Sequence, residues 1–77
     1  MKNENLTPVR PRPMGKGELA MKYAPNLLPD SAVKRLMKWI RLHPQLTAAL
    51  EATHYDPKQR IFTVRQVELI FEYLGEP

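Results

Sequence analysis

Prolines set the limits of the helices in the first two thirds of this 77-residue chain. Proline breaks a helix interior but fits the first helical position, and the residue before it avoids helical geometry. Pro25 therefore limits a first helix, which begins near Lys16, to about two turns. Pro29 opens a second helix, and the pair His43–Pro44 ends it and opens a third. The sequence predicts several short helices.

The segment 29–43 carries the clearest helical pattern in the chain. Its apolar residues recur at spacings of three and four, as on one side of a helix. They are Val33, Leu36, Met37 and Ile40. We expect this stripe to be buried, together with Leu27 and Leu28 from the preceding turn, "PNLLP".

The C-terminal segment predicts a further helix with a defined start. Thr63 followed by Gln66 is a capping-box pattern, and Gly75 is a natural helix stop. The predicted inner residues are Val64, Val67, Ile70, Phe71 and Leu74. Asp56–Pro57 marks a turn before this helix, and a short two-stranded ribbon around residues 54–62 stays open as an alternative.

These patterns predict an all-α fold, a compact three- to four-helix domain over residues 15–77. Residues 1–14 combine prolines with basic residues and few apolar ones, so we expect a flexible basic arm there. The chain has no cysteine, no signal peptide and no apolar run of membrane-spanning length. We therefore expect a cytoplasmic protein.

Positive charge is concentrated in the first half of the chain. The net charge is +4, but residues 44–77 contain only Lys58, Arg60 and Arg65 as basic residues, against five acidic ones. Such asymmetry favours an anionic partner, and double-stranded DNA is the first candidate. An ordinary solubility charge is the competing explanation.

Helix 29–43 has a cationic side opposite its apolar stripe. Lys34, Lys38 and Arg41 fall within about 60° of one another on a helical projection, and Arg35 lies to one side. A helix with its back in the core and cations in front suits contact with DNA phosphates. A solvated surface with no partner would show the same pattern. Arg10 and Arg12 in the arm are further candidates for DNA contact.

The order of the parts adds a resemblance. A short helix "GELAMKYA", a turn and the basic helix "DSAVKRLMKWIR" resemble a helix-turn-helix, including the variants of excisionases and of regulators of the mercury-resistance type. Ala20 lies where such a motif needs a small residue. The link "PNLLP" is longer than the usual turn, so the resemblance is to the wider superclass. It implies a small DNA-binding regulatory or accessory protein.

Residues 16–77 also resemble a family of small uncharacterised proteins from gut bacteria, a domain of unknown function. The shared pattern includes "KGELA", then "SAVKRLMKWI" and finally "YLGEP". The resemblance implies a compact helical domain and no particular activity, so it assigns no functional residue.

The alternative function is a non-enzymatic protein-interaction module, an adaptor or inhibitor. Trp39 lies on the flank of helix 29–43 and is the candidate partner-binding residue, although a packing role between helices is the favoured interpretation. We expect no enzyme, because no nucleophile–base set, glycine-rich phosphate loop or metal-ligand cluster is visible. No cofactor or metal is expected.

Overall fold

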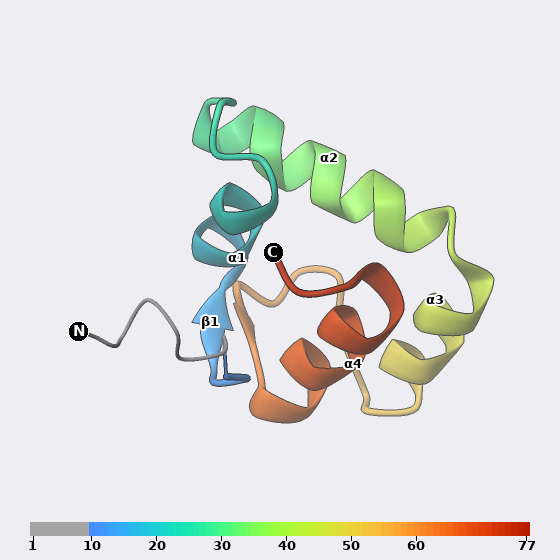
Figure 1. Cartoon of the computed structure of the whole chain (residues 1–77). Coiled ribbons are helices and arrows are strands. Elements are labelled where there is room, and N and C mark those ends of the chain that lie inside the picture. The colour runs from blue at the N-terminus through green and yellow to red at the C-terminus, as the bar shows by residue number, and fades with distance from the viewer. Residues whose placement is uncertain (1–9) are drawn as a thin grey trace.

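The structure, a computed structural model, describes residues 10–77 (Figure 1). Within this range the chain forms four helices and two short strands. In order they are β1 (Met14–Gly15), α1 (Lys16–Tyr23), α2 (Pro29–Arg41), α3 (Pro44–Glu51), β2 (Ile61–Phe62) and α4 (Val64–Leu74). The predicted compact helical fold is confirmed, with a two-stranded sheet in addition.

The helix boundaries follow from local chemistry. Pro29 and Pro44 occupy the first turns of α2 and α3, as predicted. The side chain of His43 caps α3, because its Nδ1 accepts a hydrogen bond from the backbone N–H of Leu46 at 3.3 Å. At the start of α4 the predicted capping box is present, with reciprocal side-chain and backbone bonds between Thr63 and Gln66.

The two strands join parts of the chain that lie far apart in sequence. Met14 pairs with Phe62 and Gly15 with Ile61, in antiparallel register. The ribbon considered around residues 54–62 is therefore not a local hairpin, since the partner of Ile61–Phe62 is the segment before α1. Met14 is buried, so the packed domain includes it, one residue before the expected start. Residues 1–9 of the expected arm lie outside the described residues.

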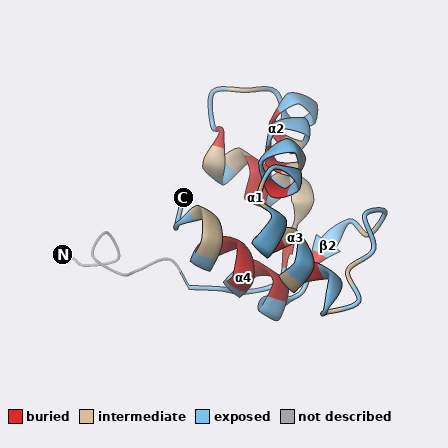
Figure 2. Ribbon diagram, turned by 90° about the vertical axis from the view of Figure 1, so that its right-hand side faces the viewer, coloured by how far each residue is buried: buried red, intermediate tan, exposed pale blue. Residues whose placement is uncertain are grey.

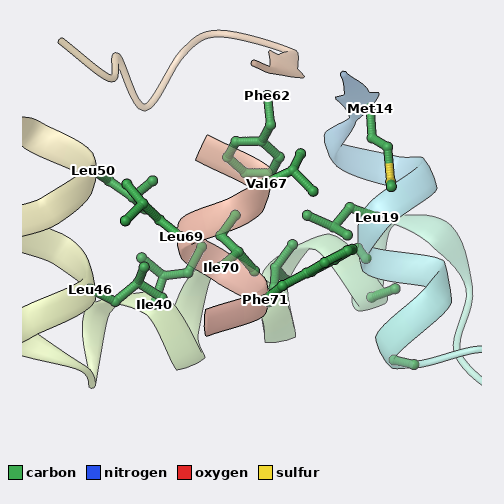
Figure 3. Close-up of a cluster of buried hydrophobic side chains, with 14 residues drawn as sticks. Met14, Leu19, Ile40, Leu46, Leu50, Phe62, Val67, Leu69, Ile70 and Phe71 are labelled. Carbon is green, nitrogen blue, oxygen red and sulfur yellow. The ribbon is translucent and has the colours of Figure 1, made fainter. Parts of the chain in front are cut away.

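The core packs against one side of α4, which has α2 above it and α3 beside it (Figure 1). Figure 3 shows three groups of buried side chains, in which Phe62, Val67, Ile70 and Phe71 form the middle one. Leu46, Leu50 and Ile40 lie on one side of this group, and Met14 and Leu19 lie on the other. Phe62 and α4 therefore connect the two halves of the domain.

Three leucine and valine positions differ from the sequence prediction. Leu28 was expected in the core, but as the N-cap of α2 it is 76% exposed. Val64 is exposed and Leu69 is buried, so the buried side of α4 is rotated from the predicted stripe. The reason is that α4 packs against neighbours on two sides, which a single helical stripe does not reveal.

The outward side of α2 is exposed along its length, while its inner side packs against α1 and α3 (Figure 2). Ala20 of α1 and Ala32 of α2 are fully buried, and their small side chains let the two helices approach closely. Among the helices of residues 10–77, none is long and apolar enough to cross a bilayer.

Candidate nucleic-acid interface

The outer side of α2 carries the four cations that the sequence singled out. Lys34, Arg35, Lys38 and Arg41 are all exposed. No acidic side chain among residues 10–77 forms an ion pair with any of them. We call Lys34, Lys38 and Arg41 the basic face; their spacing of four and three residues places them on adjacent turns. Their charge is therefore available to an external anion.

The same residues also fit the electrostatics of the helix itself. Lys38 and Arg41 lie in the last turn of α2, and Asp30 lies in the first. Cations near the C-terminus and anions near the N-terminus are stabilised by the helix dipole, typically by about 0.3–1 kcal/mol each. The basic face thus has a structural benefit whether or not a partner binds it.

The arm residues are not brought to the basic face. Arg12 pairs with Glu18 in the first turn of α1 and also donates to the carbonyl of Pro13. The hydrogen bond from Arg12 holds the pKa of the Glu18 carboxyl below its usual value. Arg10 is exposed. Residues 10–13 lead into β1 beside the start of α1, whereas α2 lies beyond the other end of that helix (Figure 1).

The arrangement of α1 and α2 shares one feature with a helix-turn-helix and differs in another, so the resemblance stays a prediction. The two helices pack together, and Ala20 is buried between them as expected. Five residues, 24–28, separate the end of α1 from the start of α2, which is longer than the turn of the strict motif.

Comparison with known proteins places the chain in a family. The family model for a domain of unknown function, DUF4248, matches residues 10–77, which is nearly the whole chain. The chain belongs to the DUF4248 family. No curated protein and no solved structure matches it.

In this DUF4248 domain, Trp39 joins α2 to α1. Its ring meets that of Tyr23 edge-on, with the centroids 6.2 Å apart and the planes at 88°. The Tyr23 hydroxyl donates in turn to the backbone carbonyl of Gly75, just after α4. Trp39 therefore has a packing role, and at 37% exposure it also presents part of its indole to solvent.

Burial raises the pKa of Tyr23 to about 12, and the nearby Glu76 carboxylate adds to the effect. Because the folded-state pKa lies above the ordinary value of about 10, folding favours the neutral phenol. This contribution to stability is complete below pH 10 and is lost as the pH rises toward 12. We expect the free energy of unfolding of Tyr23→Phe to fall less between pH 10 and pH 12 than that of the wild type. Urea unfolding at several pH values measures this difference. An unchanged pH dependence in Tyr23→Phe would contradict this account.

An apolar flank, Leu28, Trp39 and Leu42, runs beside the basic face of the DUF4248 domain. Leu28 and Leu42 lie at the two ends of α2 and are 76% and 69% exposed. Fourteen residues correspond to almost four full turns, so the two leucines lie on the same side of the helix. Sequence analysis found Trp39 but not the leucines, although this spacing was the available signal.

A pocket of about 200 Å³ lies between α2, α3 and the turn that follows α3. Its apolar lining consists of Met37, Ile40, Leu50, Tyr55 and Pro57. Arg41, Thr47 and Glu51 supply the polar lining. Sequence analysis did not identify this pocket, because its residues come from three segments that the turn at His43–Pro44 and the turn after α3 bring together.

Proposed function

We propose that this protein is a small DNA-binding regulatory or accessory factor that contacts double-stranded DNA through α2. The observation that carries the proposal is the basic face, whose three cations are exposed and have no acidic partner among residues 10–77. The opposite side of α2 is fixed in the core through Ala32, Leu36 and Ile40. Such a helix can approach phosphates without any rearrangement of the domain.

Arg35 extends the basic face on one side, and it is the residue of α2 whose guanidinium could pair with guanine beyond the phosphates. Arg12 has a weaker part in the proposal, because DNA would have to displace Glu18 from it. Arg10 is exposed at the start of the described chain. With DNA as the partner, the protein acts in the bacterial cytoplasm and affects transcription or another DNA transaction.

Binding should be strongly salt-dependent. Each phosphate neutralised contributes about −0.9 to the slope of log affinity against log salt, so three contacts give about −2.7. Raising the salt from about 50 mM to about 200 mM should then weaken binding by about 40-fold. Fluorescence anisotropy with a labelled duplex at the two salt concentrations measures this change.

Reversing the basic face should abolish binding. The variant Lys34→Glu, Lys38→Glu, Arg41→Glu replaces phosphate attraction by repulsion. All three residues are exposed, so the domain should still fold, but loss of the dipole contacts of Lys38 and Arg41 should lower its stability by at least about 0.3–1 kcal/mol each. Circular dichroism at room temperature checks that the variant is folded. The matched control is Lys58→Glu, Arg60→Glu, Arg65→Glu, which makes the same charge change outside α2. Millimolar affinity of the wild type at low salt, or equal losses in both variants, would reject the proposal.

The apolar flank supports a second candidate, a protein-interaction module. Arg35 lies midway between Leu28 and Leu42, so the flank is complementary to an amphipathic helix that carries an acidic residue between apolar ones. A second copy of the chain fits less well, because paired flanks would bring Arg35 against its counterpart. This candidate predicts a protein partner and no salt-sensitive DNA binding, and it predicts that Trp39→Ala and Leu42→Ala weaken the protein complex.

A further inference from the structure

The pocket between α2 and α3 has opposite charges on its two walls. On the α2 wall, Met37 and Arg41 are one helical turn apart, so both side chains face the pocket. On the α3 wall, Thr47 and Glu51 have the same spacing. Arg41 and Glu51 form no ion pair with each other. The mouth of the pocket therefore offers a cation on one side and an anion on the other.

The hydroxyl groups of the pocket have unused hydrogen-bonding capacity. Among residues 10–77, the Tyr55 hydroxyl donates only to Sδ of Met37, at 3.9 Å. A thioether sulfur is a weak acceptor, so a carboxylate that entered the pocket would be a better one. The Thr47 hydroxyl donates to the carbonyl of Ile40 at 2.7 Å, which leaves its oxygen lone pairs able to accept. The donors are thus Arg41 on α2 and the Tyr55 hydroxyl in the turn after α3, and the acceptors are Thr47 and Glu51 on α3.

From this arrangement we propose that the pocket binds a free aliphatic α-amino acid of about the size of leucine. The carboxylate pairs with Arg41 and accepts from the Tyr55 hydroxyl, and the ammonium group pairs with Glu51 and donates to Thr47. The aliphatic side chain lies on Ile40, Leu50 and Pro57. At about 200 Å³ the pocket is smaller than the usual drug-sized site of about 300–1,000 Å³, which suits a ligand of this size.

The ligand would also alter the basic face, because Arg41 belongs to both surfaces. A bound carboxylate neutralises Arg41 and so removes one phosphate contact, which lowers the magnitude of the salt slope by about 0.9. This consequence rests on the proposed function. Ligand binding itself is measured without DNA, so its failure and the failure of DNA binding are distinguishable.

The test is a titration of the isotope-labelled full chain with L-leucine, followed by two-dimensional NMR. We expect saturable shifts at Met37, Arg41, Glu51 and Tyr55, with a Kd of roughly 0.1–1 mM, a range that a ligand of fewer than ten heavy atoms can reach. Two analogues separate the charges: 4-methylpentanoate lacks the ammonium group, and 3-methylbutylamine lacks the carboxylate. Each should bind at least about tenfold more weakly than leucine, the cost of one lost charged contact.

Variants assign each charge to its residue. Arg41→Gln should weaken the binding of leucine and 4-methylpentanoate but not that of 3-methylbutylamine. Glu51→Gln should weaken the binding of leucine and 3-methylbutylamine but not that of 4-methylpentanoate. Arg35→Gln and Glu72→Gln are matched controls, since both residues are exposed and lie outside the pocket. All four positions are exposed, so the variants should fold. Absence of saturable shifts up to about 20 mM leucine, roughly 20 times the weakest expected Kd, or affinities that ignore both charges, would overturn the proposal.

Discussion

Phe62→Ala is expected to destabilise the domain by about 3–5 kcal/mol, the cost of truncating a buried phenylalanine. A chain of this length has a total stability of about 4–12 kcal/mol, so the variant should be partly unfolded at room temperature or close to it. The melting temperature should fall by about 15 °C or more. Thermal unfolding followed by circular dichroism measures the effect.

The size of this effect follows from how many parts of the fold meet at Phe62. The residue is fully buried, and its ring stacks on Tyr55 with the centroids 5.7 Å apart. The ammonium group of Lys16 lies 5.9 Å from the Phe62 ring centre and donates to the carbonyl of Pro57 at 2.5 Å. Phe62 also pairs with Met14 across the sheet. Its loss would loosen β1, the 55–60 turn and the start of α4 together.

The neighbouring residue provides a matched control. Ile61 lies in the same strand but is 61% exposed, so Ile61→Ala also removes a large apolar side chain but opens no cavity. We expect a loss of about 0.5 kcal/mol or less, as for most surface substitutions. Comparable losses at the two positions would show that Phe62 is not the packing centre described above.

The helices of this fold were predictable because their signals are local. Pro29, Pro44 and the Thr63–Gln66 capping box each fix a boundary through the residues next to them. Pairing of Met14 with Phe62 had no such signal, since two-residue strands show no alternation and their partners are 48 residues apart. Met14 follows three prolines and two arginines and was therefore assigned to the arm, although its side chain is buried.

The candidate site also has one part that the sequence could predict and another that it could not. The basic face of α2 depends only on helical spacing, so Lys34, Lys38 and Arg41 could be grouped from the sequence. The contact of Arg12 with Glu18 depends on how β1 turns into α1, and the sequence did not indicate it. The exposure of Leu28 was also missed, because an N-cap residue with extended geometry can point away from the core whatever its hydrophobicity.

Gln66→Ala is expected to cost about 2–4 kcal/mol, although the residue is polar, because it removes three hydrogen bonds that each contribute about 0.5–1.5 kcal/mol. Gln66 is only 2% exposed. Its side-chain oxygen accepts from the backbone N–H of Thr63 at 3.0 Å and from the Gln59 amide at 2.7 Å. Its own amide donates to the Thr53 hydroxyl at 3.0 Å. The end of α3, the following turn and α4 therefore meet at one side chain.

Urea unfolding of Gln66→Ala measures the loss, and Gln45→Ala is the matched control because Gln45 is exposed on α3. The control should change the free energy of unfolding by no more than about 0.5 kcal/mol. A double-mutant cycle with Gln59→Ala then measures how much of the loss comes from the hydrogen bond between Gln59 and Gln66. Gln59 also holds the turn itself, through the backbone N–H of Asp56 and the carbonyl of Ile61. We expect a coupling energy of about 1 kcal/mol between Gln59 and Gln66, within the range for residues of one network. Strict additivity would mean that the hydrogen bond between Gln59 and Gln66 contributes nothing to stability.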